Sequence, residues 1–152
     1  MRGRYQRHLL TLIVVGTLLF LAGCIGTKAN YAIRERPALP TAKPEQALVY
    51  VYRTSYRAPG SVVEIYWKSK IVGVLPSGAY SYFYADPGSQ LIGAHLGANA
   101  ASTNVSLKSG EVYYLKQDFS FIGVTTLEVV AADEGRAAVS TLKYTELLGP
   151  RN

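Results

Sequence analysis

The chain has 152 residues, of which 49% are hydrophobic and 17% are charged, with a formal net charge of +6 and an isoelectric point near 9.5. This length fits one domain that is large enough for a single hydrophobic core. Cys24 is the only cysteine, so an intramolecular disulfide and a zinc site built on several thiolates are both excluded.

The N-terminal segment has the composition of a secretory signal. Arg2, Arg4 and Arg7 precede an apolar run over residues 9–22, and small residues close the run. The run has 14 residues, fewer than the ~20 that a transmembrane helix needs to cross a bilayer. The length favours a cleaved signal, and the alternative is a retained anchor or a plain signal followed by a chance cysteine.

The end of this run, Leu21-Ala22-Gly23-Cys24, resembles the lipobox of bacterial lipoproteins. The resemblance implies cleavage between Gly23 and Cys24 and acylation of Cys24, with palmitate as a typical acyl group. Two or three acyl chains form a stable anchor, whereas one binds only marginally. Ile25 follows the cysteine where aspartate is typical of inner-membrane retention, so by this analogy the outer membrane, facing the periplasm, is favoured over the inner membrane.

Processing would also change the charge of the chain. Removal of residues 1–23 takes away three of the 16 basic residues and leaves 13 against 10 acidic ones, a net charge of +3. A nucleic-acid partner therefore loses its electrostatic support, and secretion excludes it further.

Residues 24–45 are expected to form a lipidated N-terminus and a tether, because Pro37, Pro40 and Pro44 interrupt a polar segment without helical or strand periodicity. Basic residues in this tether could also contact anionic lipid headgroups.

From residue 46 the pattern changes to short runs rich in β-branched and aromatic residues, separated by Gly, Pro, Asp and Ser turns. This spacing predicts an all-β fold, an antiparallel β-sandwich of about seven to eight strands over residues 46–145, followed by a tail at 146–152. A short C-terminal helix over 133–142 is possible, with a turn and a last strand as the alternative. The expected strands cover residues 47–54, 62–67, 71–75, 79–85, 89–96, 103–107, 112–118 and 124–131.

Residues 46–139 resemble a family of small bacterial lipoproteins that carry a domain of unknown function and look like PEGA-type β-sandwiches. The resemblance implies a fold and an envelope location, and no activity. It rests on residues 47–53 and 70–75, on Gly78-Ala79-Tyr80, on the turn Asp86-Pro87-Gly88, and on residues 110–115.

Tyrosine is unusually frequent, and the spacing of these residues suggests a binding face. Tyr80, Tyr82 and Tyr84 alternate along one expected strand and so share one face, as Tyr50 and Tyr52 do on another. Such a row could stack on sugar rings or anchor a protein partner. The alternative is that these tyrosines cover a small core and pair across strands.

Other chemistry-bearing residues are scattered. Trp67, Lys68 and Lys70 form an expected hairpin tip that could contact an anionic polymer or headgroups, or simply be solvated. His95 has no second histidine near it outside the signal segment, and the carboxylates Glu64, Asp86, Glu111, Asp118 and Glu128 occur singly. Two opposed acidic groups, as a glycosidase requires, are not indicated. No catalytic residue, metal site or cofactor is predicted.

The sequence therefore favours an outer-membrane lipoprotein whose sandwich is a non-catalytic binding or assembly module, with an envelope protein or peptidoglycan as possible partner. One alternative is a peptidoglycan or glycan binder that uses the tyrosine face, and another is a hydrolase or inhibitor whose site forms only on folding. An exposed row of Tyr80, Tyr82 and Tyr84 would favour the glycan binder, and burial of that row would favour a scaffold or protein partner.

Overall fold

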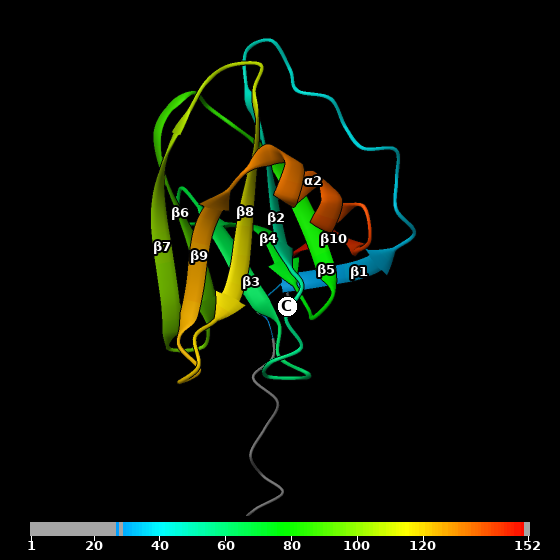
Figure 1. Cartoon of the computed structure of the whole chain (residues 1–152), viewed down its shortest axis with the longest axis vertical. Helices are drawn as coiled ribbons and strands as arrows, with labels where there is room; N and C mark the ends of the chain where they lie inside the picture. Colours follow the sequence, from blue (N-terminus) through cyan, green and yellow to red (C-terminus); the bar gives the residue numbers. More distant parts are fainter. Residues whose placement is uncertain (1–26, 28, 151–152) are drawn as a thin grey trace, which may run out of the picture.

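The computed structural model describes residue 27 and residues 29–150, and this part of the chain folds into two β-sheets packed face to face with one short helix, α2 (Figure 1). No helix in the described part is long and apolar enough to cross a membrane. The six-stranded sheet has the order β1 (Ala29–Arg34), β10 (Lys143–Pro150), β5 (Ala79–Ala85), β2 (Ala47–Arg53), β8 (Val112–Phe119) and β9 (Thr125–Val130). The four-stranded sheet has the order β4 (Lys70–Leu75), β3 (Val63–Trp67), β6 (Gly88–Leu96) and β7 (Asn99–Leu107).

The sandwich and the short C-terminal helix agree with the prediction, but the strand pairing is not antiparallel throughout. All pairs of the four-stranded sheet are antiparallel, whereas β2 pairs with β8 and β5 pairs with β10 in parallel. The reason is that the chain crosses to the other sheet between these strands, so that β8 enters beside β2 from the same end. Backbone hydrogen bonds from Gly110 N to Gln46 O (3.1 Å) and from Leu48 N to Glu111 O (2.9 Å) fix that entry.

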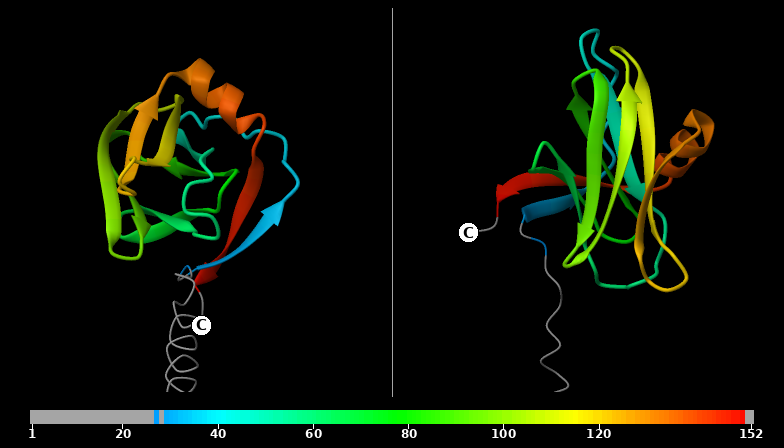
Figure 2. Two further views of the ribbon diagram at one scale, coloured as in Figure 1. Left: turned by 60° about the horizontal axis from the view of Figure 1, so that its bottom comes forward. Right: turned by 90° about the vertical axis from the view of Figure 1, so that its left-hand side faces the viewer.

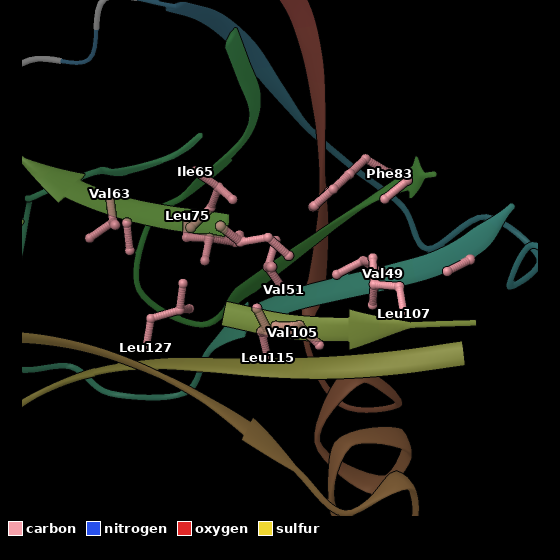
Figure 3. Packing of buried hydrophobic residues seen from close by; sticks show 14 of the residues in the cluster. Val49, Val51, Val63, Ile65, Leu75, Phe83, Val105, Leu107, Leu115 and Leu127 are labelled. Carbon is pink, nitrogen blue, oxygen red and sulfur yellow. The ribbon is translucent and has the colours of Figure 1, made fainter. Parts of the chain in front are cut away.

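The main core fills the space between the sheets (Figure 3). Alternate residues of each strand point into it, as Val49 and Val51 do from β2 and as Val63 and Ile65 do from β3. Phe83 and Ala85 of β5 also belong to this core, so the face of β5 opposite its tyrosines is the inner one.

A second buried cluster lies on the outer face of the six-stranded sheet, beneath α2 (Ala132–Val139) (Figure 2). Its buried members are Leu48, Tyr50, Tyr52, Tyr80, Tyr114 and Val139. The helix backbone comes very close to the sheet at Gly135, where a Cβ atom would lie only 2.2 Å from Cβ and Cγ of Tyr114. Glycine is therefore required at this position for the helix to cover the tyrosines.

Three segments differ from the strand prediction. Residues 29–34 form strand β1 within the expected tether, and β10 continues to Pro150 where a tail was expected. The two segments pair with each other, Ala29 opposite Pro150 and Arg34 opposite Tyr144, so each becomes a strand through a partner more than 100 positions away in the sequence. Residues 99–102, which precede the strand expected over 103–107, extend β7 because each pairs with β6. Their small side chains have little strand propensity of their own.

Candidate functional site

An open groove lies on the outer face of the four-stranded sheet, over β3, β6 and β7, and has a volume of about 580 Å³. Several of its lining residues occupy outward positions, among them Leu91, which is 58% exposed. Such concave surfaces with aromatic walls and few polar groups are the usual form of binding sites. The lining residues are Tyr66, Trp67, Lys68, Ser69, Gln90, Leu91, Gly93, His95 and Ser102.

Glu64, Tyr66 and His95 form a connected polar group at this face. Glu64 of β3 is the cross-strand partner of His95 of β6, and the Tyr66 hydroxyl donates a hydrogen bond to Oε2 of Glu64 at 2.7 Å. The rings of Tyr66 and His95 are in contact, with centroids 4.6 Å apart. Thr27 donates from its hydroxyl to Oε1 of the same carboxylate at 2.7 Å, so hydrogen bonds reach both oxygens of Glu64.

Burial, followed by the hydrogen bond to Glu64 and the negative charge of that residue, raises the pKa of Tyr66 to about 12. The phenol of Tyr66 is therefore a neutral donor at physiological pH. In this arrangement Tyr66 orients the carboxylate and presents its ring to the groove, while the His95 ring adds a second flat surface.

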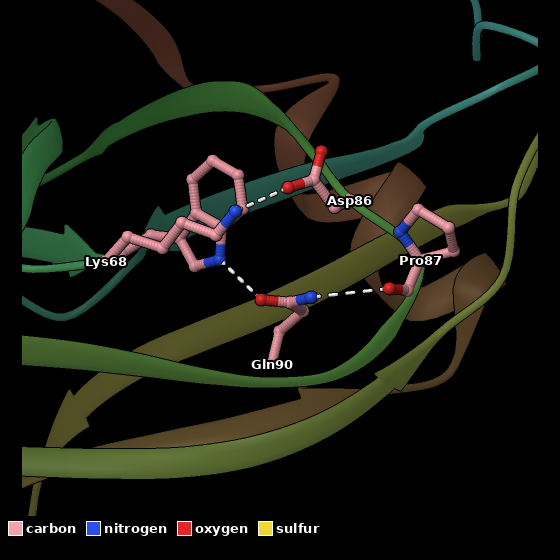
Figure 4. A network of polar contacts seen from close by, with 5 residues as sticks. Lys68, Asp86, Pro87 and Gln90 are labelled. Carbon is pink, nitrogen blue, oxygen red and sulfur yellow. Dashed lines mark hydrogen bonds and ion pairs between the residues drawn. The ribbon is translucent and has the colours of Figure 1, made fainter.

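The expected basic tip is a real hairpin, but two of its three residues are engaged by neighbours. Trp67 packs on Phe83 of the core and donates from Nε1 to Oε1 of Gln90 at 2.9 Å, and Gln90 in turn bonds Pro87 O (Figure 4). Lys68 lies over the Trp67 ring and forms an ion pair with Asp86. The two-residue turn between β3 and β4 places Lys68 at φ 50° and Ser69 at φ 60°, and Lys70 is exposed at the start of β4.

The expected tyrosine face is mostly an interior surface. Tyr50, Tyr52 and Tyr80 are buried, and only Tyr82 and Tyr84 are half-buried. Tyr50 stacks on Tyr114 with centroids 5.2 Å apart, and donates from its hydroxyl to Pro40 O at 3.3 Å. These contacts match the alternative of core coverage and cross-strand pairing, and the buried rings are closed to a sugar ring in this fold.

The segment before β2 also covers this cluster. The Tyr84 hydroxyl donates to Thr41 O at 3.0 Å, and Nζ of Lys43 lies 4.1 Å from the centroid of the Tyr84 ring. Residues 40–43, expected as part of a tether, are thus packed on the folded domain.

Arg53 was not singled out by the sequence, although it is the largest fully buried side chain of the described residues. Its guanidinium donates to the carbonyl oxygens of Ser61 at 3.1 Å and Ala58 at 3.2 Å, and lies over the ring of Phe119. Burial lowers the pKa of Arg53, and the charge of Asp118 partly opposes that effect. Arg53 therefore holds the loop over residues 54–62 in place. The one sequence signal for a buried arginine here is its position at the end of a run of apolar residues.

The groove as a whole was likewise missed, although Trp67 and Lys68 of the expected basic tip line it. The predicted residues Gly23 and Cys24 lie outside the described residues. A sequence signal for the groove existed in the outward positions Leu91, Gly93 and His95, which alternate along one strand. That signal could not be interpreted without knowing which strand lies beside β6, because Tyr66 comes from another strand, β3.

Comparison with known proteins identifies relatives without an assigned activity. Residues 43–131 match the model of a family described as a protein of unknown function, DUF2846. An uncharacterized protein of Haemophilus influenzae is 24% identical over 134 residues, which cover 85% of this chain and 80% of that protein. No solved structure matches the chain.

Proposed function

The chain belongs to the DUF2846 family of proteins of unknown function, and we propose that it is a lipid-anchored protein of the cell envelope whose β-sandwich is a non-catalytic binding or assembly module. The anchor is the lipobox-like Leu21-Ala22-Gly23-Cys24, with acylation at Cys24 and the domain on the periplasmic side of the outer membrane. The likeness to PEGA-type sandwiches belongs to the same proposal.

The burial of Tyr50, Tyr52 and Tyr80 is the observation that favours an assembly or protein-binding module over a glycan binder. A glycan-binding surface on the tyrosine face needs exposed rings, whereas buried rings form a rigid part of the domain. The surface left for a partner is the groove over β3, β6 and β7, which is lined by the exposed Leu91 among other residues. Both oxygens of Glu64 already accept hydrogen bonds, and this supports a binding role over acid–base chemistry at the groove.

The proposed anchor predicts a chemical modification. The Cys24→Ser variant should lose incorporation of an alkyne-tagged fatty acid completely, because the thioether that starts lipoprotein processing cannot form on serine. Mass spectrometry of the N-terminal peptide of the parent protein should show cysteine as residue one with its acyl chains. A parent chain that keeps residues 1–23, or a Cys24→Ser chain that is still labelled, would contradict the anchor.

The groove can be tested in cells with a photo-crosslinking amino acid at Leu91 and, as a matched control, at Val129, which is exposed on β9 of the other sheet. We expect an adduct of defined mass from position 91 that disappears when Tyr66 and His95 are replaced by alanine, and none from position 129. Equal adducts from both positions would argue against the groove.

Sedimentation of the same protein with purified peptidoglycan, before and after muramidase digestion, tests the glycan alternative. Retention that is lost on digestion would favour a wall-binding protein in place of an assembly module.

A further inference from the structure

The described chain begins on the folded domain itself, very close to the proposed lipid anchor. Thr27 donates to Glu64 near the start of β3, and Ala29 N donates to the Thr27 hydroxyl at 3.0 Å. Only three peptide units separate Thr27 from Cys24, so the two Cα atoms are at most about 11 Å apart. If Cys24 carries the lipid, the end of the sandwich that holds Thr27 must lie at the bilayer surface. The inference below rests on that proposed anchor.

Hydrogen bonds and strand pairing identify the loops at this end. Glu64 is paired with His95, which lies just before the turn that joins β6 to β7. Asn99, the first residue after that turn, donates to Gly123 O at 2.8 Å and accepts from Thr125 N at 2.9 Å. The β8–β9 turn is thereby tied to the β6–β7 turn, and both lie at the lower end of the sandwich in Figure 1.

The loop over residues 54–62 joins the same end. The Arg57 guanidinium donates to Phe119 O at 2.8 Å, immediately before the β8–β9 turn. A Cβ at Gly78 would lie 3.0 Å from the Tyr56 hydroxyl, which places Tyr56 beside the turn between β4 and β5. Arg57 therefore lies beside the β8–β9 turn and Tyr56 beside the β4–β5 turn, and both belong to the loop that enters β3 just before Glu64, the residue that Thr27 contacts.

These loops display apolar side chains to solvent. Phe121 is 97% exposed, Ile122 is 82% exposed and Tyr56 is 75% exposed, and the first two are the most exposed large hydrophobic residues of the described chain. The opposite end of the sandwich is formed by the segment before β2 and by the β7–β8 turn, at the top of Figure 1. It displays the exposed charged residues Lys43, Glu45, Lys108 and Glu111, and its exposed apolar residues, Leu39 at 41% and Val112 at 37%, are much less accessible than Phe121 and Ile122. The apolar tip and the charged tip thus lie at opposite ends.

We propose that the Phe121–Ile122 tip and Tyr56 enter the interfacial region of the bilayer that carries the lipid on Cys24. A large aromatic and a β-branched side chain on a fixed turn bury apolar surface there, and the amphipathic Tyr56 ring suits the headgroup level. Arg57 lies where its exposed stem and charge can meet anionic headgroups. The domain then stands on the membrane in a fixed orientation, with the charged end directed away from it.

The test uses the full acylated protein in vesicles of phosphatidylethanolamine and phosphatidylglycerol. A nitroxide is attached at Phe121→Cys and, as the matched control, at Ser109→Cys in the β7–β8 turn. Cys24 is the only native cysteine, and acylation blocks it, so the label goes to the introduced thiol. Collision rates of the nitroxide with oxygen, which concentrates in the bilayer, and with a water-soluble nickel complex report its depth.

We expect oxygen collisions to exceed nickel collisions several-fold at position 121, and nickel collisions to dominate at position 109. Ile122→Cys repeats the measurement with Phe121 intact, in case the first variant folds poorly. Acylated protein with equally water-exposed labels at 121, 122 and 109 would overturn the membrane contact and leave the anchor standing. A mass spectrum that shows Cys24 without acyl chains would instead overturn the anchor, and the inference with it.

Discussion

At the scale of single residues, backbone geometry dictates side-chain choice most clearly in the β3–β4 turn. Lys68 and Ser69 both adopt positive φ angles, which residues with a Cβ atom occupy at a cost of about 1 kcal/mol or more. Two-residue hairpin turns of this kind usually contain Asn-Gly for that reason. The ion pair of Lys68 with Asp86 and its position over Trp67 offset part of the cost.

Ser69→Gly should therefore raise the free energy of unfolding by about 0.5–1 kcal/mol, because glycine adopts this φ without strain. Denaturant unfolding of the full chain measures the change. The control is Ser102→Gly on strand β7, where the φ angle is not positive and the substitution should destabilise. A stability loss in Ser69→Gly equal to that of the control would show that the turn is not strained.

Arg53 shows how a charged side chain can be buried without a hydrogen bond to a carboxylate. The two terminal nitrogens of its guanidinium donate to main-chain carbonyl groups of residues 57–61 and of Leu75, which orders a loop that has little regular structure of its own, while Nε has no hydrogen-bond partner among the described residues. The planar group with five donors suits this task, and lysine has neither the shape nor the number of donors to replace it.

At the scale of the secondary-structure elements, the packing of α2 on the six-stranded sheet depends on the residue at one position. Helix propensity alone favours alanine over glycine by about 1 kcal/mol, and on that ground Gly135 weakens a helix prediction for this segment. The structure reverses the argument, since the helix backbone at Gly135 rests directly on the Tyr114 side chain.

We predict that Gly135→Ala destabilises the domain by about 1–3 kcal/mol, because overpacking against Tyr114 outweighs the gain in propensity. Near-ultraviolet circular dichroism should change as well, since α2 must move from the tyrosine cluster. Arg136→Ala, at an exposed neighbouring position, is the control and should have an effect within about 0.5 kcal/mol. Stabilisation by Gly135→Ala would mean that α2 is not docked as described.

Strands β1 and β10 depend on each other, because neither segment is specified as a strand by its own sequence. Figure 2 shows them running crosswise to the other strands, and Thr145 fixes the crossing by donating to Val74 O at 2.6 Å in the four-stranded sheet. Ser81 of β5 donates to Thr145 O at 3.2 Å from the other side. These hydrogen bonds of Thr145 link the two sheets. Because β1 pairs with β10, they also help to bring the start of the described chain close to Glu64.

At the scale of the whole molecule, the tyrosine cluster joins the six-stranded sheet, the helix and the segment before β2 into one unit. Burial raises the pKa of Tyr52 to about 12, with the charges of Glu134 and Glu128 adding to the effect, and it also raises the pKa values of Tyr50, Tyr80 and Tyr144. These phenols keep their protons in the folded state at a pH where the unfolded chain loses them, near 10.

The folded protein therefore binds more protons than the unfolded chain above pH 10, and its free energy of unfolding falls as the pH rises through the folded pKa values. We expect full stability from these groups below pH 10 and a steep loss between about pH 10 and 12. Chemical unfolding over this range should show a shallower loss in Tyr52→Phe than in the parent. Tyr56→Phe, which removes the hydroxyl of an exposed tyrosine, is the matched control. An identical slope in Tyr52→Phe and the parent would contradict the prediction.

The sequence by itself determined the fold class, most of the strands and the turns between them, because period-two alternation and Pro-Gly, Ser-Gly or Lys-Ser turns are local signals. It also predicted that Tyr80, Tyr82 and Tyr84 share one face of a strand, and it indicated the anchor at Cys24, which lies outside the described residues.

Only the tertiary structure decided which residues pack against each face of these strands. Burial of Tyr50, Tyr52 and Tyr80 depends on α2 and on residues 40–43, and the groove depends on Tyr66 and His95 lying side by side on neighbouring strands. Strand β1 exists through its pairing with β10, and that pairing brings Thr27 to the end that displays Phe121. These are contacts between residues distant in the sequence, and local propensity carries no information about which distant partner a strand or a ring will find.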